Sequence, residues 1–135
     1  MQYWLFKEEP GCYSFEQLTK DKRTTWDGIK NNLALKYLRT VKKGDRALFY
    51  HTGKIKAVVG EMVVVSEPRA EEDNEKLVVV DVEVVQPLSP VSLAALKAEP
   101  VMQESPLVKI SRLSVVPLTK GQWQRILAMS QEEES

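Results

Sequence analysis

The sequence predicts an α+β protein built on a curved, partly closed and mainly antiparallel β-sheet with short flanking helices. Segments rich in β-branched residues are concentrated in the middle of the chain, and such residues favour strands. The links between these segments, near residues 53 and 70, are too short for the helical crossover that parallel neighbours need. The helical signals are short and lie mostly outside this central region, as in other α+β domains.

Five strands are predicted from β-prone residues bounded by turn residues. The first is rich in aromatic residues and ends before Pro10. In the fourth, valines alternate with Asp81 and Glu83, which indicates one buried and one solvent-facing side. Pro87 and Pro90 are expected to end that strand. The predicted strands cover residues 2–6, 46–52, 56–66, 76–85 and 111–116.

Three or four short helices are predicted from capping and periodicity signals. Ser14 with Gln17, and Thr119 with Gln122, have the spacing of capping boxes, in which two side chains satisfy backbone donors at a helix start. Trp123 is expected to face the core from the last of these helices. The other two helices are predicted over residues 32–38 and 91–98.

Length and composition predict one folded domain over residues 1–130, followed by a disordered acidic tail over residues 131–135. Hydrophobic residues make up 43% of the chain, enough for one compact core. The single Cys12 cannot form an internal disulfide, which favours a reducing cytoplasm. No secretory signal or membrane-spanning apolar run is visible, so we expect a cytoplasmic protein with no membrane partner.

The charges balance overall but are unevenly distributed. Lys and Arg number 19, as do Asp and Glu. Residues 20–56 contain eleven basic and three acidic residues, whereas residues 67–104 contain nine acidic and three basic ones. A zero net charge argues against a protein that coats nucleic acid through many phosphate contacts. The basic region is either ordinary solvated surface or a rim that meets a phosphate backbone at one place.

The usual catalytic constellations are missing from the sequence. One histidine and one cysteine cannot form a metal cluster, and no nucleophile-elbow sequence is present. His51 lies inside a predicted strand, where a histidine hydrogen-bonded at a strand end is a simpler interpretation than a catalytic base. We therefore expect no catalytic residues, no metal, no cofactor and no enzymatic activity.

Aromatic residues at element ends are the strongest local indication of a binding site. Trp26 lies in a polar, turn-like segment, where a large ring either packs over the core or forms a platform for a planar ligand. A base stacked on such a ring gains about 1–3 kcal/mol. Tyr50, His51 and Thr52 end a predicted strand just before a turn, where side chains often line the mouth of a pocket.

Five sequence blocks, in order along nearly the whole chain, resemble the EVE domain family of the PUA-like superfamily. They are YWLFKEEP, YSFEQL, TTWDGIKNNLALKYLR, KKGDRALFYHT and RLSVVPLTKGQW. The resemblance implies a curved, barrel-like sheet with surrounding helices. It also implies a pocket that accepts a flipped-out, often methylated base of DNA or RNA.

The resemblance transfers functional roles to particular positions of this sequence. Trp26 matches a tryptophan that forms a wall of the base cage in related readers. Tyr50 and His51 match the family's F-Y-H-S block. The residues expected to flank the pocket are Lys7, Glu9, Pro10, Asp27, Gly28, Asn31 and Arg112.

Our hypothesis from the sequence is a module that binds a modified base, methylated in the first instance, by stacking it on Trp26. Tyr50 or another aromatic residue would complete an aromatic cage. Hydroxyl groups of Ser14, Thr52 and Ser114 would bond the edge of the base, with His51 in the same pocket. Lys30, Lys36 and Arg39 would hold flanking phosphates.

Two alternatives stay open at this point. PUA-like relatives include hydrolases, so a nucleic-acid-processing enzyme is one of them. A module that binds a small planar metabolite or a peptide is the other. The sequence does not decide between these functions, nor between DNA and RNA.

Overall fold

The computed structural model describes residues 1–134, and Ser135 lies outside the described residues. In this part of the chain a mixed sheet of seven strands has the order β2-β6-β4-β3-β1-β7, with β5 paired to β6. Only the β1–β3 pair is parallel, so the predicted mainly antiparallel sheet is confirmed. The strands are β1 (Tyr3–Glu8), β2 (Arg23–Trp26), β3 (Arg46–His51), β4 (Ala57–Val64), β5 (Arg69–Glu71), β6 (Asn74–Ser92) and β7 (Val115–Leu118).

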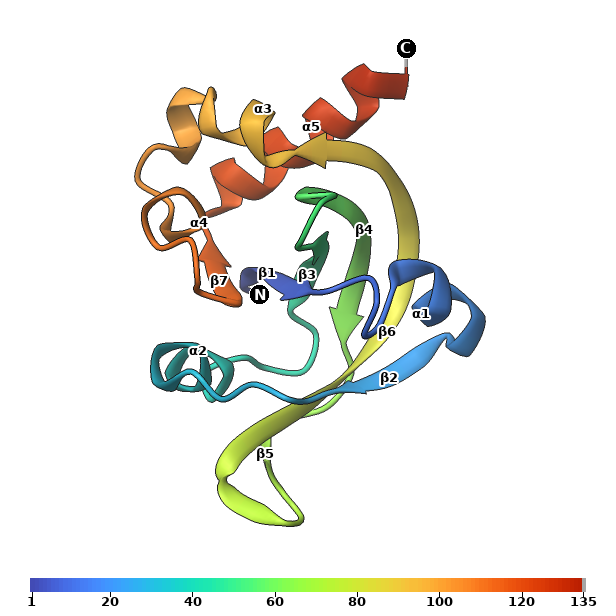
Figure 1. Cartoon of the computed structure of the whole chain (residues 1–135), viewed down its shortest axis with the longest axis vertical. Coiled ribbons are helices and arrows are strands. Elements are labelled where there is room, and N and C mark those ends of the chain that lie inside the picture. The colour runs from blue at the N-terminus through green and yellow to red at the C-terminus, as the bar shows by residue number, and fades with distance from the viewer. Residues whose placement is uncertain (135) are drawn as a thin grey trace.

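The barrel expected from the sequence is not confirmed. β2 and β7 are the two ends of the strand order, and no pairing joins them in residues 1–134. The sheet is strongly curved along β6, which runs from the β5 hairpin at one end of the molecule to the helices at the other (Figure 1). Its pairing with β4 shifts register between Val58 and Gly60 and again between Glu61 and Met62. Such irregularities bend and twist a strand, which accounts for curvature without closure.

Strand β6 continues through Pro87 and Pro90, which the sequence predicts to end it. Proline cannot donate a ladder hydrogen bond, but it is tolerated at bulges. Pro87 pairs with Gly60, directly beside a register shift. The irregular pairing therefore accommodates the proline and lets one strand of 19 residues serve both ends of the sheet.

Strand β2 forms in a segment that the sequence predicts to be a turn. It is an edge strand whose partner, β6, lies far along the chain. Across this pair the Thr25 hydroxyl donates to an oxygen of Asp81 at 2.7 Å. β2 matters for function because it places Trp26 and the loop that follows it beside the end of β1.

The helices are short except for the last. Gln17 N donates to the Ser14 hydroxyl at 3.0 Å, which confirms Ser14 as a helix cap. Gln122 N donates to the Thr119 hydroxyl, and Thr119 N donates to the Gln122 side chain, so the second predicted capping box is complete. The helices are α1 (Phe15–Asp21), α2 (Asn32–Leu38), α3 (Leu93–Lys97), the 3-10 helix η1 (Pro100–Met102), α4 (Pro106–Lys109) and α5 (Lys120–Glu134).

Helix α5 carries the chain to the end of the described region. The backbone of residues 131–134 is helical, whereas the sequence predicts a disordered acidic tail from residue 131. Trp123 on this helix is buried and packs against the ring of Tyr3 at 4.9 Å, which confirms its predicted place in the core. None of the helices in residues 1–134 combines the length and apolar character needed to cross a membrane.

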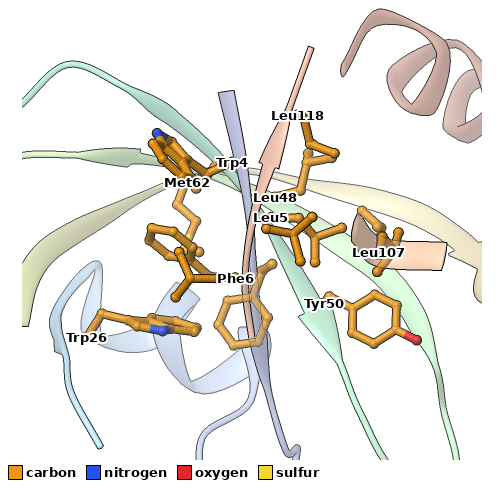
Figure 2. Close-up of a cluster of buried hydrophobic side chains, with 14 of the residues drawn as sticks. Trp4, Leu5, Phe6, Trp26, Leu48, Tyr50, Met62, Leu107 and Leu118 are labelled. Atoms are coloured by element: carbon orange, nitrogen blue, oxygen red, sulfur yellow. The ribbon is translucent and has the colours of Figure 1, made fainter. Parts of the chain in front are cut away.

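The core covers both faces of β1 and β3, because consecutive residues of each strand, 4–6 and 47–50, are buried. It includes aromatic side chains from β1, β2 and β3 (Figure 2). Gly60 of β4 is part of it, because a Cβ at this position would lie only 2.1 Å from the ring of Phe15. Phe15 in turn packs edge-on against Phe49 at 5.5 Å. Residue 60 must therefore be glycine for α1 to dock on the sheet.

Candidate functional site

Two adjoining hollows meet at the ends of β1 and β2, and we call them together the Asp27 cleft. The larger has a volume of about 440 Å³ and the smaller one of about 320 Å³, which is the size range of small-ligand pockets. Glu8, Cys12 and Asp27 line both hollows. The larger is completed by Lys7, Gly28, Ile29, Lys30 and Ser114, and the smaller by Tyr13, Thr24, Thr25 and Trp26.

The backbone around the cleft is set by two local features. Gly28 follows β2 with a φ of 78°, a left-handed conformation that favours glycine, and a Cβ there would meet only open space. Asn31 then caps α2, because its side chain accepts from Ala34 N at 3.0 Å. On the opposite side, Lys7 N donates to the Ser114 carbonyl at 2.9 Å, which joins β1 to the segment before β7.

The cleft combines hydrogen-bond acceptors with donors. Burial raises the pKa of Glu8, a bond from the Glu9 N–H lowers it, and the nearby Asp27 and Glu9 carboxylates raise it. Burial lowers the pKa of Lys7, whose ammonium donates to the Ser111 carbonyl at 3.0 Å. The acidic residues Glu8 and Asp27 and the basic residue Lys30 therefore border one small volume. Such a mixture suits a ring that carries both donors and acceptors on its edge. The Lys7 ammonium lies away from this volume, toward Ser111 and the Tyr50 ring.

Trp26 belongs to the core as much as to the cleft. Its side chain is 3% exposed and lies against the rings of Phe6 at 5.5 Å and Phe49 at 5.2 Å. Its indole N–H is buried and has no hydrogen-bond partner among residues 1–134. This burial agrees with the interpretation in which the ring packs over the core, rather than with the one in which it forms a platform for a ligand. The ring forms part of the cleft wall, but it has no free face for stacking in this conformation.

The other residues expected in the base pocket are not gathered around Trp26. Tyr50 and Thr52 line a separate pocket of about 240 Å³, and Trp26 and Tyr50 lie on opposite sides of the buried cluster (Figure 2). The backbone N–H of Phe15 donates to His51 Nε2 at 3.1 Å. Ser14 caps α1, and only Ser114 shares the Asp27 cleft with Trp26. Tyr50 therefore does not share the cleft with Trp26, and the aromatic residue that lines the smaller hollow with Trp26 is Tyr13.

Only some of the residues expected to flank the pocket or to hold phosphates line the Asp27 cleft. Lys7, Asp27 and Gly28 line the Asp27 cleft, as does Lys30 of the expected phosphate contacts. The Arg39 guanidinium donates to the Lys76 carbonyl at 3.0 Å, and Lys36 is exposed on α2. Glu9, Pro10, Asn31 and Arg112 do not line the hollows described here. In the turn after β1, the Glu9 carbonyl accepts from the N–H groups of Cys12 and Tyr13.

Sequence reasoning missed six cleft residues, which are Glu8, Cys12, Tyr13, Thr24, Thr25 and Ile29. Glu8 ends β1 and Ile29 follows Gly28, so both lie next to positions that the sequence analysis did select. The signal that could have found them is their place at an element end. Among the described residues, no three side chains of His, Cys, Asp or Glu are grouped so that they could hold a metal ion.

His51 gives the protein a pH-dependent stability. Burial lowers its pKa below the ordinary value of 6.5, and its Nε2 must be unprotonated to accept from Phe15 N. Below about pH 6.5 the unfolded chain binds a proton that the folded protein does not. The stability associated with neutral His51 is therefore complete above that pH and is lost as the pH falls toward the lowered pKa. We expect a lower urea midpoint at about pH 5.5 than at about pH 7.5.

A His51→Gln variant is the matched control for this pH effect. Its amide oxygen can still accept from Phe15 N but does not titrate. The difference in urea midpoint between the two pH values should shrink in this variant. An unchanged difference would show that other groups cause the pH dependence.

Comparison with known proteins places this geometry in a family. The family model described as the EVE domain matches residues 2–129. Thymocyte nuclear protein 1 of Rattus norvegicus is 34% identical over 170 aligned positions, which cover 98% of this chain and 75% of that protein. Because 170 positions exceed the length of this chain, the rat protein carries additional residues within the aligned region.

Solved structures agree with this assignment. The protein Rpa0253 from Rhodopseudomonas palustris superposes with a TM-score of 0.91 at 35% identity, over 98% of this chain and 94% of that one. The human THYN1 protein, crystallised in complex with DNA that contains 5-methylcytosine, superposes with a TM-score of 0.88 at 29% identity, over 96% of this chain and 98% of that one. On the family model and these relatives together, the chain belongs to the EVE domain family.

Proposed function

We propose that this protein binds nucleic acid carrying a modified, methylated base, and that the Asp27 cleft holds that base. The observation that carries the proposal is the cleft itself, which has the size of a small ligand and both acceptors and donors along its walls. The DNA complex of the human relative supports this choice of ligand and makes 5-methylcytosine in DNA the first candidate.

The carboxylates of the cleft suit a base with an exocyclic amino group. Cytosine presents such an amino donor, and Asp and Glu side chains are its usual acceptors. Glu8 and Asp27 can serve in this way, and Lys30 can donate to ring nitrogen or carbonyl acceptors. Ile29 supplies apolar surface in the larger hollow. Covering a methyl group there gains about 1 kcal/mol, or about a fivefold preference over the unmodified base.

The base must leave its stack to reach the cleft. Extrusion from a duplex costs a few kcal/mol, so single-stranded or mispaired DNA is the better ligand. The zero net charge predicts few phosphate contacts and therefore a shallow dependence of affinity on salt. Recognition is then determined mainly within the cleft.

The state of the one histidine supports binding rather than catalysis. His51 Nε2 already accepts a backbone hydrogen bond, so it is not available to take a proton from a substrate. We infer a reader module, which releases the nucleic acid unchanged.

The test is a fluorescence anisotropy titration with short single-stranded DNAs that carry one central cytosine or 5-methylcytosine. We expect about fivefold tighter binding of the methylated strand. Asp27→Asn should weaken binding of both strands by about tenfold, because it removes a charged acceptor. Lys120→Ala, an exposed change at the start of α5 outside the cleft, is the matched control and should change affinity little.

Matching RNA strands in the same titration decide which nucleic acid is preferred. Equal binding of methylated and unmethylated strands would contradict base reading. Full affinity in Asp27→Asn would contradict the placement of the base in this cleft. Protein unfolding under the same conditions must be measured for each variant, so that loss of structure is not taken for loss of binding.

A further inference from the structure

A second pocket, which we call the Lys97 pocket, lies on the other side of Lys7 from the Asp27 cleft. It has a volume of about 240 Å³. Lys7 contributes to both pockets, so they are neighbours within the same molecule. Figure 2 shows Tyr50 beside Leu107, with its hydroxyl group directed away from the buried cluster. The lining residues are Lys7, Tyr50, Thr52, Gly53, Lys56, Leu93, Lys97, Leu107, Val108 and Ser111.

The charges of the Lys97 pocket have one sign. Lys7, Lys56 and Lys97 line it together, and no carboxylate is among its lining residues. None of these three lysines forms a salt bridge within residues 1–134. Glu9 lies beside the pocket, since one of its carboxylate oxygens is 3.8 Å from where a Cβ of Gly53 would be, but it is not a lining residue. Converging ammonium groups attract an anion.

The fold brings these three lysines together from distant parts of the chain. The Lys7 ammonium is fixed by its bond to the Ser111 carbonyl at 3.0 Å and lies 5.5 Å from the Tyr50 ring centre. Lys56 has a φ of 47°, which residues other than glycine rarely adopt, and its carbonyl accepts from Leu93 N at 2.8 Å. That bond ties the loop before β4 to the first residue of α3, the helix on which Lys97 lies.

The remaining lining residues define the rest of the ligand. Tyr50, Thr52 and Ser111 bring hydroxyl groups that can donate to oxygen atoms. Leu93, Leu107 and Val108 bring apolar side chains, which suit the carbon skeleton to which an anion is attached. A carboxylate carries one charge and would leave two lysines unneutralised. A phosphate group offers more oxygens and up to two charges, and lysine binds phosphate well as a point charge.

We propose that the Lys97 pocket is a phosphate site that binds the phosphate of a nucleotide, with the attached sugar against Leu93 and Leu107. The nucleotide is either free or part of a strand. The strand form rests on the proposed function, because the base of a neighbouring nucleotide would then occupy the Asp27 cleft. The sequence analysis expected phosphate contacts from Lys30, Lys36 and Arg39, and this pocket uses a different set of lysines.

The first experiment titrates ¹⁵N-labelled protein with inorganic phosphate and with deoxycytidine 5′-monophosphate, at an ionic strength held constant with chloride. We expect saturable shifts of the amide signals of Thr52, Gly53 and Ser111, with tighter binding of the nucleotide. The double variant Lys56→Gln, Lys97→Gln should weaken both ligands by about tenfold. The control Lys76→Gln, Lys120→Gln removes the same charge from exposed lysines outside the pocket and should leave binding unchanged.

The second experiment measures the salt dependence of DNA binding in the same variants. If a strand phosphate occupies the pocket, Lys56→Gln, Lys97→Gln weakens methylated and unmethylated strands equally. It also lowers the slope of log affinity against log salt by about 0.7–1, the change expected for one phosphate contact, with the methyl preference intact. If the ligand is a free nucleotide, only mononucleotide binding changes.

The two proposals fail in distinguishable ways. Shifts that grow without saturating, or binding of phosphate, mononucleotide and strand that is unaffected by the double variant, would overturn the phosphate site. Loss of the methyl preference in the wild-type protein, with phosphate binding intact, would overturn the proposed base reading alone.

Discussion

Replacing Trp26 with alanine should lower the free energy of unfolding by about 3–5 kcal/mol, the range measured for large aromatic side chains removed from a core. The reason is that the ring is 3% exposed and packs against Phe6 and Phe49, at centroid distances of 5.5 and 5.2 Å. Alanine would leave a cavity between β1, β2 and β3 that the surrounding strands cannot close. Urea denaturation followed by circular dichroism measures the loss.

A Trp26→Phe variant is the control for this prediction. It keeps an aromatic ring in the core and also removes the buried indole N–H that has no hydrogen-bond partner among residues 1–134. Trp26→Phe should therefore lower the free energy of unfolding much less than Trp26→Ala does. A loss under about 1 kcal/mol in Trp26→Ala would contradict the core assignment and favour an exposed stacking platform instead.

The expected loss of stability affects how a binding experiment on Trp26→Ala should be interpreted. Because Trp26 supports the core, a loss of DNA binding in Trp26→Ala would not by itself identify a contact with the base. Asp27 and Lys30 are exposed and line the same cleft. Substitutions at these two positions report on the cleft with less risk to the fold.

Replacing Asp45 with alanine should lower the free energy of unfolding by about 3 kcal/mol, since it leaves several donors unsatisfied. The carboxylate is 3% exposed. One oxygen accepts from Gln2 N at 3.0 Å, and the other accepts from Trp4 Nε1 at 3.0 Å and from Lys42 N at 2.9 Å. These three bonds tie the start of β1 to the turn before β3.

Thermal or urea unfolding measures the effect of Asp45→Ala. Asp73→Ala, in the exposed hairpin between β5 and β6, removes the same charge and should change stability by less than about 0.5 kcal/mol. Asp45→Asn should lie between the two, because its amide NH₂ cannot accept from the donors that face it. Equal stability of the alanine variants at positions 45 and 73 would refute the role given to the buried carboxylate.

The local parts of the fold could be predicted from the sequence. Ser14 and the Thr119–Gln122 pair are caps in the structure because capping depends only on residues within one turn of helix. Trp123 is buried as its helical periodicity indicates. The edge strand β2 and the passage of β6 through Pro87 could not be predicted, because both depend on partners far away in the chain.

The candidate site was predicted in part. The wrong assignments in that prediction have one physical origin. Lys7, Asp27, Gly28, Lys30 and Ser114 do line one cleft with Trp26. Tyr50 does not, because β1 pairs with β3 in a register that sets Lys7 opposite Tyr50. Phe6 of β1 packs against Trp26, whereas Tyr50 lines the Lys97 pocket. Strand order, which a single sequence does not reveal, thus decides which aromatic residues share a pocket.

The position of β1 within the sheet has a consequence for how the chain folds during synthesis. β1 pairs with β3 on one side and with β7, near the end of the chain, on the other. Contacts between such distant segments slow folding to the millisecond-to-second range. A nascent chain therefore exposes one edge of the apolar segment Tyr3–Phe6 until β7 has left the ribosome. The domain can be completed only after translation of nearly its whole length.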